Sequence, residues 1–505
     1  MTNGDSTHPT IRSGRLTVYE LFRSRARRDP DALAIECGDR RTSYAELDRR
    51  VRRLAGGLLR RGLQRGDRIA IVSENRPEYI ELQLAAALIG AIVACQNWRL
   101  SQAELRHCIA LVTPKLVVAS ARHHDATRAA CELPIENMDT RWDTLFADPA
   151  EADENIDPED GLVILYTSGT TGMPKGALIS HRAEIARMTA LRMDLGVREN
   201  DGFVAWAPLF HMGSTDQSLA ALMSGAPVVV IDGLDAQRIV KAMVDHKLGW
   251  LLLMPGSIEP VVDILRSTGA RPRGVRAIGA MADLVPTALI AELTRLSGSP
   301  YLNSFGSTET GLPPCSNALI PPGETPSSLS KRQSALCDIK LVDEDGAEVA
   351  LGEPGEMAIR GPTVFSGYWQ AEETNRRDFA GGYFRMGDLF RRNADGTYDF
   401  IDRAKYMIKS GGENIYPAEI ERVLLSDPRI ADAVVVRRRD DTWGEVPVAF
   451  VAGKAPGLTN ADIDALCRAH LASYKRPKAV RFIAFEDFPR STTGKIQRHE
   501  MEKWL

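Results

Sequence analysis

The segment Thr167–Gly176 combines hydroxyl groups, glycines and a lysine directly after the apolar run Gly161–Tyr166. Glycine lets a backbone turn tightly and present its N–H groups, and N–H groups, hydroxyls and an ammonium group together suit a polyphosphate. A Ser/Thr/Gly-rich surface loop is the alternative, but the buried type of strand before the segment favours the phosphate loop. The spacing is not that of a Walker A loop. The phosphate-binding candidates are Thr167, Ser168, Gly169, Thr170, Thr171, Gly172 and Lys175.

The segment 301–311 carries an aromatic ring, hydroxyl groups and one carboxylate. Phe305 can stack on a nucleobase. Thr308 and Glu309 can hold a hydrated Mg²⁺ beside phosphate groups. A polar turn between two elements explains the same residues equally well when the segment is taken alone.

Four further positions have side chains that can contact a substrate. Asp388 follows a glycine turn, where a carboxylate can accept both hydroxyls of a ribose, although an Asp that caps a turn is common. Arg403 can reach a ribose or phosphate, or pair with a surface carboxylate. Lys495 follows a glycine near the C-terminus, where most lysines are solvated. His211 lies among apolar residues, where a buried histidine with a structural role is a more common explanation than a substrate contact.

Helical and strand patterns alternate through most of the chain, which predicts α/β layers with largely parallel sheets. Such sheets bind ligands at the carboxyl ends of their strands, and the loop after 161–166 has that position. Ser43 and Glu46 have capping-box spacing. The apolar stretch Leu82–Cys95 is too short to span a bilayer and is expected to form a buried helix. The expected helices are Tyr44–Leu59 and Tyr79–Ala91, and the expected strands are Asp67–Val72, Lys115–Ala119, Pro227–Ile231, Trp250–Met254 and Val275–Ile278.

From about Asp338 the pattern changes to short strands and turns such as Asp345-Gly346, which predicts a smaller β-rich subdomain. About 100 residues follow the charged junction Asp402–Lys405, enough for an independent α+β domain. The expected strands of the subdomain are Ile339–Val342, Glu356–Arg360 and Thr397–Ile401. The last domain is expected to contain helices Pro417–Leu425 and Ala461–His470 and strands Ala433–Arg437, Val446–Val451 and Val480–Ala484.

The composition is that of an ordinary globular protein. The 505 residues have a formal net charge of −4, which disfavours a nucleic-acid partner because such proteins need a basic face. The seven cysteines are odd in number and lack C-x-x-C spacing, which favours reduced thiols in the cytoplasm over disulfides or a zinc site. The polar N-terminus has no apolar core for a signal peptide, and no transmembrane segment is expected.

Taken together and in this order, the segments resemble the acyl- and aryl-CoA synthetases of the adenylate-forming superfamily, which also holds luciferases and adenylation domains of peptide synthetases. The resemblance covers about residues 16–500. It implies that a carboxylate attacks the α-phosphate of ATP to give an acyl-adenylate and pyrophosphate, after which a thiol, usually that of coenzyme A, displaces AMP. Its most specific elements are Tyr166–Gly176, Phe305–Thr310, Phe384–Asp388, Asp402–Gly412 and Ser491–Lys495.

The resemblance also implies a role for each catalytic candidate. Lys495 would bridge the carboxylate and the α-phosphate, Thr308 would contact that phosphate, and Glu309 would hold Mg²⁺. Asp388 and Arg403 would hold the ribose. The segment 279–282 departs from the family pattern, because it lacks the usual proline and has a methionine in place of the common alanine. The remaining nucleotide-binding residues implied are Gly279, Ala280, Met281, Ser304, Phe305, Gly306 and Ser307, with Phe305 where the family often has tyrosine.

The implied fold is α/β, with a large N-terminal domain of several subdomains and a small mobile C-terminal domain. The expected parts are a flexible N-terminus at 1–15, an AMP-binding domain at 16–401, a hinge at 402–405 and the mobile domain at 406–505. Lys405 matches the hinge position, and Gly411, Gly412, Trp443, Tyr474 and Arg476 match residues that contact coenzyme A, although Trp443 can also be a packing aromatic. His211 would border the acyl pocket, whose other candidates are Trp206, Met212, Gly213, Asp216 and Met254.

The acid cannot be identified from these residues, and an aryl, alicyclic or medium-chain acid is expected. A dicarboxylate would need an additional cation, for which the sequence offers no position. Asp216 is equally compatible with a pocket residue and a surface residue. A stand-alone enzyme that loads a carrier-protein thiol is the alternative, but amino acid substrates are disfavoured because His211 replaces the Asp that binds the ammonium group. The sequence offers no positive sign of a luciferase-like oxygenase. The presence of Lys495, Glu309, Asp388 and Lys175 disfavours an inactive scaffold that retains the fold. A homodimer is compatible with the sequence.

Overall fold

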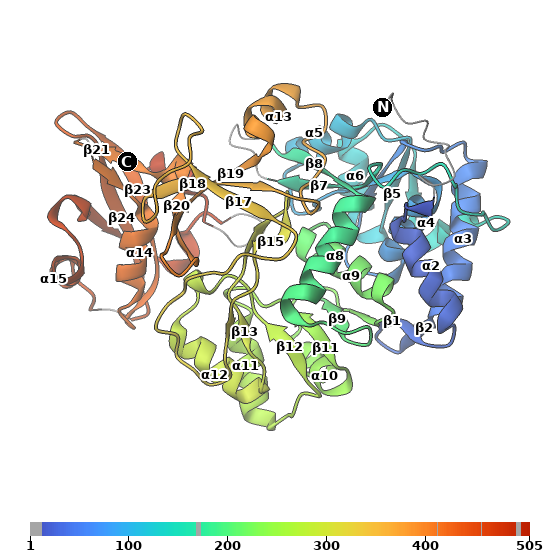
Figure 1. Ribbon diagram of the computed structural model, residues 1–505, viewed down its shortest axis with the longest axis horizontal. Helices are drawn as coiled ribbons and strands as arrows, with labels where there is room; N and C mark the ends of the chain where they lie inside the picture. The colour runs from blue at the N-terminus through green and yellow to red at the C-terminus, as the bar shows by residue number, and fades with distance from the viewer. Residues whose placement is uncertain (1–12, 168–172, 412, 456, 491–495) are drawn as a thin grey trace. The chain divides into compact units, whose positions relative to one another are not determined.

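The computed structural model describes residues 13–167, 173–411, 413–455, 457–490 and 496–505 (Figure 1). The chain forms two compact units. Unit 1 comprises residues 13–328, 332–338 and 360–379 of the described chain, and unit 2 comprises 329–331, 339–359 and the described part of 380–505. Among the helices in the described ranges, none combines the length and hydropathy needed to cross a bilayer.

Unit 1 contains an eight-stranded sheet with strand order β16-β13-β12-β11-β9-β10-β1-β2. Its inner strands from β13 to β1 run parallel, and antiparallel β16 and β2 close its two edges. The parallel arrangement follows from the helices between successive strands and confirms the prediction for this part of the chain. The strands are β1 (Leu33–Cys37), β2 (Arg40–Ser43), β9 (Gly202–Ala205), β10 (Val228–Val230), β11 (Leu248–Leu251), β12 (Val275–Ile278), β13 (Tyr301–Leu302) and β16 (Leu319–Ile320).

A second sheet of unit 1 has the order β6-β5-β3-β4-β7-β8, parallel except for the last pair. The expectation that Leu82–Cys95 is one helix is wrong. Helix α4 ends at Ile89, Gly90 adopts a left-handed φ of 71°, and the chain continues as buried β4. The strands are β3 (Arg68–Val72), β4 (Ile92–Cys95), β5 (Leu116–Ala119), β6 (Ile135–Asn137), β7 (Gly161–Thr167) and β8 (Lys175–Ser180).

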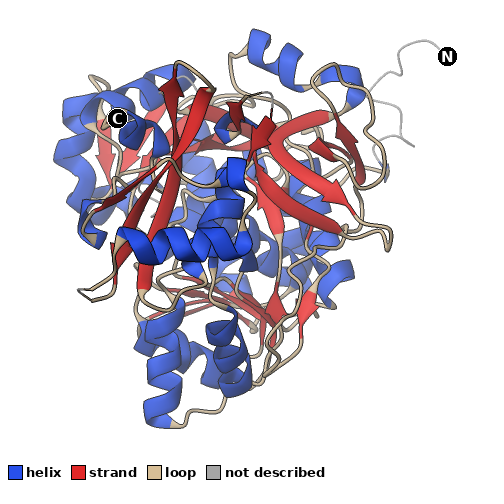
Figure 2. Ribbon diagram, turned by 90° about the vertical axis from the view of Figure 1, so that its left-hand side faces the viewer, coloured by secondary structure: helices blue, strands red, loops and turns tan. Residues whose placement is uncertain are grey.

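Helices accompany these sheets, as Figure 2 shows with helices in blue and strands in red. Helix α3 begins where the Ser43 hydroxyl accepts the backbone N–H of Glu46, which is one of the two hydrogen bonds of the predicted capping box. Helices α8 and α9 pack on each other, and both contact β15 (Figure 1). The helices of unit 1 are α2 (Val18–Arg28), α3 (Tyr44–Arg60), α4 (Pro77–Ile89), α5 (Gln102–Val112), α6 (His124–Ala130), α7 (Met138–Arg141), α8 (His181–Leu195), α9 (Met212–Ser224), α10 (Ala236–Asp245), α11 (Ile258–Thr268), α12 (Thr287–Ser297) and α13 (Glu372–Asp378).

Unit 2 contains two sheets. One has the order β17-β18-β19-β20 and is the predicted β-rich part, and the other has the order β22-β21-β24-β23, with β25 parallel to β24. Strand β23 is much longer than predicted because its charged residues Arg437–Asp440 continue the antiparallel pairing with β24. The strands are β17 (Asp338–Val342), β18 (Pro354–Arg360), β19 (Phe384–Arg392), β20 (Tyr398–Arg403), β21 (Ile408–Ser410), β22 (Glu413–Ile415), β23 (Ile430–Asp440), β24 (Gly444–Gly453) and β25 (Ala479–Phe482), and the helices are α14 (Pro417–Leu425), α15 (Asn460–His470) and α16 (Arg498–Glu502).

Candidate active site

Most predicted substrate contacts in unit 1 follow the carboxyl ends of adjacent parallel strands. Trp206 follows β9, Gly279 follows β12, and Ser304 and Phe305 follow β13. The segment after β11 begins at Leu252, because β11 covers Leu248–Leu251 rather than the predicted Trp250–Met254. Ligands of open α/β sheets bind at this edge. The predicted acid-binding and adenine-binding residues therefore share one edge of one sheet.

The acyl-pocket candidates meet around Leu252. The indole N–H of Trp206 donates to the Leu252 carbonyl at 2.7 Å. A Cβ atom on Gly213 would lie 3.0 Å from Leu252 Cδ2, so the glycine leaves room beside that side chain. His211 precedes the first residue of α9, Met212, and its ring lies 4.6 Å from that of Phe210. Met254 is partly exposed two residues beyond Leu252. The structure thus brings together segments that lie apart in the sequence.

The turn after β12 requires its glycine. Gly279 has a φ of 87°, and a Cβ atom there would lie 2.2 Å from the ring of Tyr301. Its carbonyl accepts the indole N–H of Trp250 at 2.7 Å. Ala280 and Met281 follow with partly exposed side chains, as residues that line a ligand would be. This fixed turn supports the adenine-side assignment of 279–281, which remains a prediction.

The predicted phosphate loop closes a β-hairpin. Thr167, the last residue of β7, pairs with Lys175, the first residue of β8. Ser168, Gly169, Thr170, Thr171 and Gly172 lie outside the described residues. The segment 366–369 extends this edge of the sheet, because Leu178 donates to it and accepts from it through the backbone, and the Gly176 carbonyl accepts the Trp369 N–H. The hairpin thus places Lys175 beside a part of the chain that the sequence patterns did not single out.

That neighbouring segment contributes Tyr368. The Lys175 ammonium lies 4.9 Å from the centre of the Tyr368 ring, and the Tyr368 hydroxyl donates to Glu309 Oε1 at 2.8 Å. Burial lowers the pKa of Lys175, while the carboxylates of Asp378 and Glu309 oppose that shift. Burial, followed by the Glu309 carboxylate, raises the pKa of Tyr368 well above 10, so the hydroxyl stays protonated. Tyr368 therefore links the predicted phosphate-binding lysine to the predicted metal-binding carboxylate.

Thr308 and Glu309 lie at the turn of a small hairpin formed by β14 (Phe305–Ser307) and β15 (Gly311–Cys315). Gly306 is required here, because a Cβ atom would lie 2.1 Å from the Gly311 carbonyl oxygen. The backbone N–H of Phe365 donates to the Glu309 carbonyl at 2.8 Å. A single fixed carboxylate beside hydroxyl groups is a donor set that Mg²⁺ accepts together with phosphate oxygens. The residues present therefore fit the predicted metal.

Asp216 is not a surface residue. Its side chain is 1% exposed, and its carboxylate lies 2.9 Å from the Arg187 guanidinium, which is equally buried. Arg187 lies on α8 and Asp216 on α9, so the ion pair joins the two packed helices. The carboxylate is thus already engaged within the protein.

In unit 2 the predicted ribose ligands are neighbours across two strands. Asp388 of β19 pairs in register with Arg403 of β20, and the guanidinium lies 3.1 Å from the Asp388 carboxylate. Asp388 is 3% exposed, whereas the Arg403 side chain is 42% exposed. The neighbouring Asp402 is buried and accepts the backbone N–H groups of Arg403 and Ala418, both at 2.7 Å. The pairing of β19 with β20 therefore holds Asp388 and Arg403 together before any ligand binds.

The predicted coenzyme A contacts in unit 2 include two exposed aromatic rings. Trp443 and Tyr474 are 49% and 40% exposed. Gly411 has a φ of 58°, and a Cβ atom there would lie 2.6 Å from the Trp443 ring. The Arg476 guanidinium donates to the Leu471 carbonyl at 3.1 Å. Lys405, the hinge candidate, lies in a short 3₁₀ helix with its ammonium over the Tyr406 ring, while Gly412 and Lys495 lie outside the described residues.

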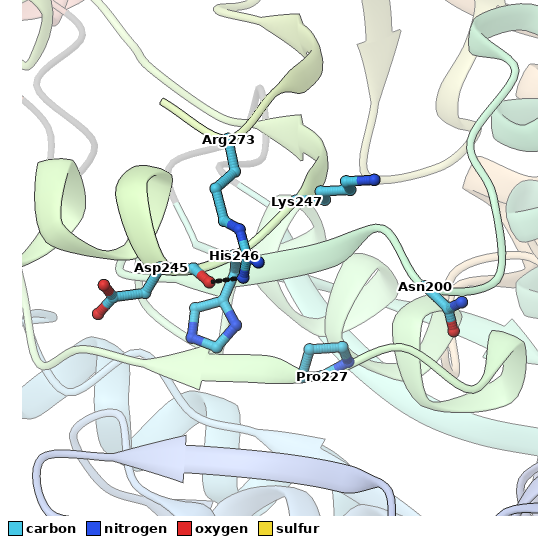
Figure 3. A pocket seen from close by; sticks show the side chains of 6 residues that line it. All are labelled: Asn200, Pro227, Asp245, His246, Lys247 and Arg273. Carbon is cyan, nitrogen blue, oxygen red and sulfur yellow. Dashed lines mark hydrogen bonds between the residues drawn. The ribbon is translucent and has the colours of Figure 1, made fainter. Parts of the chain in front are cut away.

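A polar pocket of about 220 Å³ lies elsewhere in unit 1 (Figure 3). Its residues precede β9, β10, β11 and β12, so it lies at the amino ends of the strands, opposite the predicted site. The Arg273 guanidinium is held there by the Asp245 carbonyl at 2.8 Å. Because open α/β sheets bind substrates at the carboxyl ends, this pocket is not the candidate active site. Its lining residues are Asn200, Pro227, Asp245, His246, Lys247 and Arg273.

Sequence relatives match nearly the whole chain. This chain is 33% identical to an indoleacetate–CoA ligase of Aromatoleum aromaticum, over 94% of this chain and 95% of the relative. It is 31% identical to a 2-succinylbenzoate–CoA ligase of Bacillus licheniformis, over 95% and 98%.

Solved structures with the same fold also match nearly the full length. An o-succinylbenzoate–CoA synthetase of Bacillus subtilis, solved with its acyl-adenylate intermediate, has a TM-score of 0.85 at 26% identity and covers 97% of this chain and 98% of its own. An ATP-bound MatB of Rhodopseudomonas palustris has a TM-score of 0.82 at 27% identity and covers 97% and 99%.

The AMP-binding enzyme family matches residues 22–369, and the AMP-binding enzyme C-terminal domain matches residues 419–495. The family match covers well over half of the chain and includes the phosphate loop, the Gly279 turn and the Glu309 hairpin. These findings confirm the predicted resemblance and fold class. The chain therefore belongs to the AMP-binding enzyme family of the adenylate-forming superfamily, and the relatives named above are CoA ligases.

Proposed function

We propose that this protein is an AMP-forming ligase that joins an aromatic monocarboxylic acid to coenzyme A, with ATP as the energy source. The observation that carries the proposal is the shared edge of the eight-stranded sheet, where the acid-side residues around Leu252, the Gly279 turn and the Phe305–Glu309 segment follow adjacent strands. An acid and an adenosine bound along one edge would have their reacting groups side by side.

In the first half-reaction a carboxylate oxygen attacks the α-phosphorus, the bond to the bridging oxygen breaks, and pyrophosphate leaves. The incoming anion approaches a phosphate that is already anionic, so the barrier depends on cations and fixed donors. We assign the loop 167–175 and Lys175 to the departing phosphates, Thr308 to the α-phosphate and Glu309 to Mg²⁺. Mg²⁺ would neutralise charge on the phosphates, and Lys495 would bridge the carboxylate and the α-phosphate.

In the second half-reaction the thiol sulfur of coenzyme A attacks the acyl carbon and AMP leaves. We assign Asp388 and Arg403 to the ribose and the exposed rings of Trp443 and Tyr474 to the nucleotide of coenzyme A. Gly411 and Gly412 would line the path of the thiol. A hinge at 402–405, with Lys405 as its last residue, would allow 406–505 to turn relative to 16–401 between the two steps.

The side chains around the acid position favour an aromatic substrate. The candidates include the Trp206 indole, the His211 imidazole and two methionines, Met212 and Met254, whose flexible thioethers pack well against rings. A second carboxylate group on the substrate would need a cation in the pocket that is not already paired. The nearby buried guanidinium of Arg187 already has its charge matched by Asp216, which favours a monocarboxylic acid such as indole-3-acetate or phenylacetate over 2-succinylbenzoate.

An ATP–pyrophosphate exchange assay with a panel of acids tests the substrate class. The panel contains indole-3-acetate, phenylacetate, benzoate, 2-succinylbenzoate, octanoate and phenylalanine. We expect the highest kcat/KM for an aromatic monocarboxylate. Preference for phenylalanine with transfer to a carrier-protein thiol would support the alternative of a stand-alone adenylation enzyme. We also propose a cytoplasmic location, which suits the odd number of cysteines, and a homodimer, which light scattering would test.

A further inference from the structure

The guanidinium of Arg187 joins three segments around the candidate site. It lies on α8, is almost fully buried, and donates from Nε to the Thr363 carbonyl at 3.0 Å. One terminal nitrogen donates to Asp216 Oδ2 at 2.9 Å, and the other donates to the Thr308 carbonyl at 3.1 Å. Thr308 precedes Glu309, and Thr363 precedes the segment that carries Tyr368. One side chain therefore holds the backbone of both segments that fix the Glu309 carboxylate.

The hairpin also packs directly on this arginine. Gly311, the first residue of β15, has a φ of 77°, and a Cβ atom there would lie 2.7 Å from Arg187 Cδ. No other residue type fits this position without displacing the arginine. The close contact and the hydrogen bond to Thr308 act on the same turn from the same side chain. The position of the turn relative to α8 is therefore fixed by packing as well as by polar contacts.

The buried charges around Arg187 balance without the substrate. Asp216 matches the guanidinium, and Glu184, also on α8, is fully buried beside Asp216. Burial, followed by the charge of Asp216, raises the pKa of Glu184 well above its usual range, which favours its neutral form. The Asp216 carboxylate then balances the Arg187 guanidinium. A buried ionic group of this kind adds little to stability but fixes geometry.

We propose that Arg187, held by Asp216, is a positioning residue that sets Thr308 and Glu309 in place for Mg²⁺ and the α-phosphate. This inference rests on the proposed function of the Thr308–Glu309 turn. Residues that hold a metal-binding carboxylate or its backbone in place fix the direction of that carboxylate, and their loss typically lowers metal affinity or activity about 10–100-fold. Arg187 is 2% exposed and three of its N–H groups donate within the protein, which favours a positioning role over direct contact with the substrate.

The decisive variant is the double substitution Arg187→Met with Asp216→Asn, because it removes both buried charges together and avoids leaving either one unpaired. We expect it to fold and to raise the Mg²⁺ concentration for half-maximal exchange and the KM for ATP about ten-fold or more. The KM for coenzyme A should stay unchanged. Arg182→Met is the matched control, since Arg182 lies on the same helix and holds the Pro362 and Val364 carbonyls but does not contact Thr308. Glu184→Gln should resemble the wild type, because burial favours the neutral form of this carboxyl and Arg187 pairs with Asp216 instead.

The substitution Glu309→Gln distinguishes a failure of the inference about Arg187 from a failure of the proposed function on which that inference rests. Loss of Mg²⁺-dependent exchange in Glu309→Gln, together with wild-type Mg²⁺ and ATP dependence in the double variant, would overturn the positioning role and leave the proposed function standing. Wild-type kinetics in both would overturn the role of Glu309 itself and the inference with it. An equal ten-fold loss in Arg182→Met would also overturn the inference, because the effect would then come from the 362–364 segment.

Discussion

The hydroxyl group of Tyr368 donates a 2.8 Å hydrogen bond to Glu309 Oε1, while the face of its ring lies 4.9 Å from the Lys175 ammonium. One tyrosine thus contacts both the cation assigned to the departing phosphates and the carboxylate assigned to Mg²⁺. The hydroxyl fixes the direction of the carboxylate, and the ring offers a cation–π contact to the lysine. The two assigned charges are therefore held in one fixed arrangement before ATP binds.

The substitution Tyr368→Phe should raise the Mg²⁺ requirement of ATP–pyrophosphate exchange by roughly ten-fold. It removes the hydroxyl group but keeps the ring beneath Lys175, so the lysine contact should survive. The half-saturating Mg²⁺ concentration, measured at saturating acid, checks the result. Tyr368→Leu, which removes both contacts, should additionally raise the KM for ATP. A Tyr368→Phe enzyme with the wild-type Mg²⁺ requirement would show that Glu309 does not depend on this hydrogen bond.

The substitution Gly213→Val should narrow the range of acids. A Cβ atom added to Gly213 would lie 3.0 Å from Leu252 Cδ2, so the two methyl groups of a valine would fill the space beside Leu252. We expect kcat/KM for indole-3-acetate to fall by at least about ten-fold, which corresponds to about 1.4 kcal/mol. The value for acetate on the same variant is the internal control and should change little. Equal losses for both acids would place Gly213 outside the acyl pocket.

The two half-reactions should respond to different residues. Lys495→Ala should abolish adenylate formation but retain thioester formation from a supplied acyl-adenylate. Gly411→Ala should do the reverse, because the new Cβ atom would lie 2.6 Å from the Trp443 ring and would strain a backbone with a φ of 58°. Stopped-flow measurement of each half-reaction checks both variants. Equal loss of both steps in Lys495→Ala would contradict a lysine that acts only in adenylation.

The imidazole of His181 should make the stability of unit 1 depend on pH. It is completely buried at the start of α8 and accepts the backbone N–H of Val18, and burial lowers its pKa from 6.5 to about 4. Between these two values the unfolded chain binds a proton that the native chain does not bind. The free energy of unfolding therefore falls as the pH falls from about 6.5 to about 4, by about 3 kcal/mol in total.

The substitution His181→Asn tests this titration, because the amide oxygen can accept the Val18 N–H without binding a proton. Urea unfolding, measured at intervals between pH 4 and pH 7, gives the dependence of the free energy of unfolding on pH. The variant should have a flatter dependence than the wild type, whatever its absolute stability. Parallel curves for the two proteins would exclude His181 as the titrating group.

Elements with clear periodicity and end signals could be predicted from the sequence. The predicted bounds Val275–Ile278 and Pro417–Leu425 match β12 and α14. The prediction failed at Leu82–Cys95, where a continuous apolar run hides the change from helix to strand at Gly90. Both halves are buried on all sides, so neither has the polar face that would reveal its period. The predicted length of strand β23 is too short for the opposite reason, because the charged residues at its end are typical of a loop.

The candidate site was predicted from local segments, and the residues that connect those segments were missed. Tyr368 is 59 residues from Glu309, and Arg187 is 121 residues from Thr308. Such contacts depend on how strands and helices meet in space, and a single sequence carries no signal of them. A weak signal did exist for Arg187, since its neighbours Ala186 and Met188 on α8 are apolar and a buried arginine needs a partner.

The central claim is that ATP and an aromatic monocarboxylic acid yield an acyl-CoA, with AMP and pyrophosphate as the other products. The most direct test incubates the enzyme with ATP, Mg²⁺, indole-3-acetate or phenylacetate, and coenzyme A, and quantifies the products by mass spectrometry. We predict equal amounts of acyl-CoA and AMP, and accumulation of enzyme-bound acyl-adenylate when coenzyme A is omitted. Formation of ADP, or acyl-adenylate that coenzyme A fails to consume, would contradict the account.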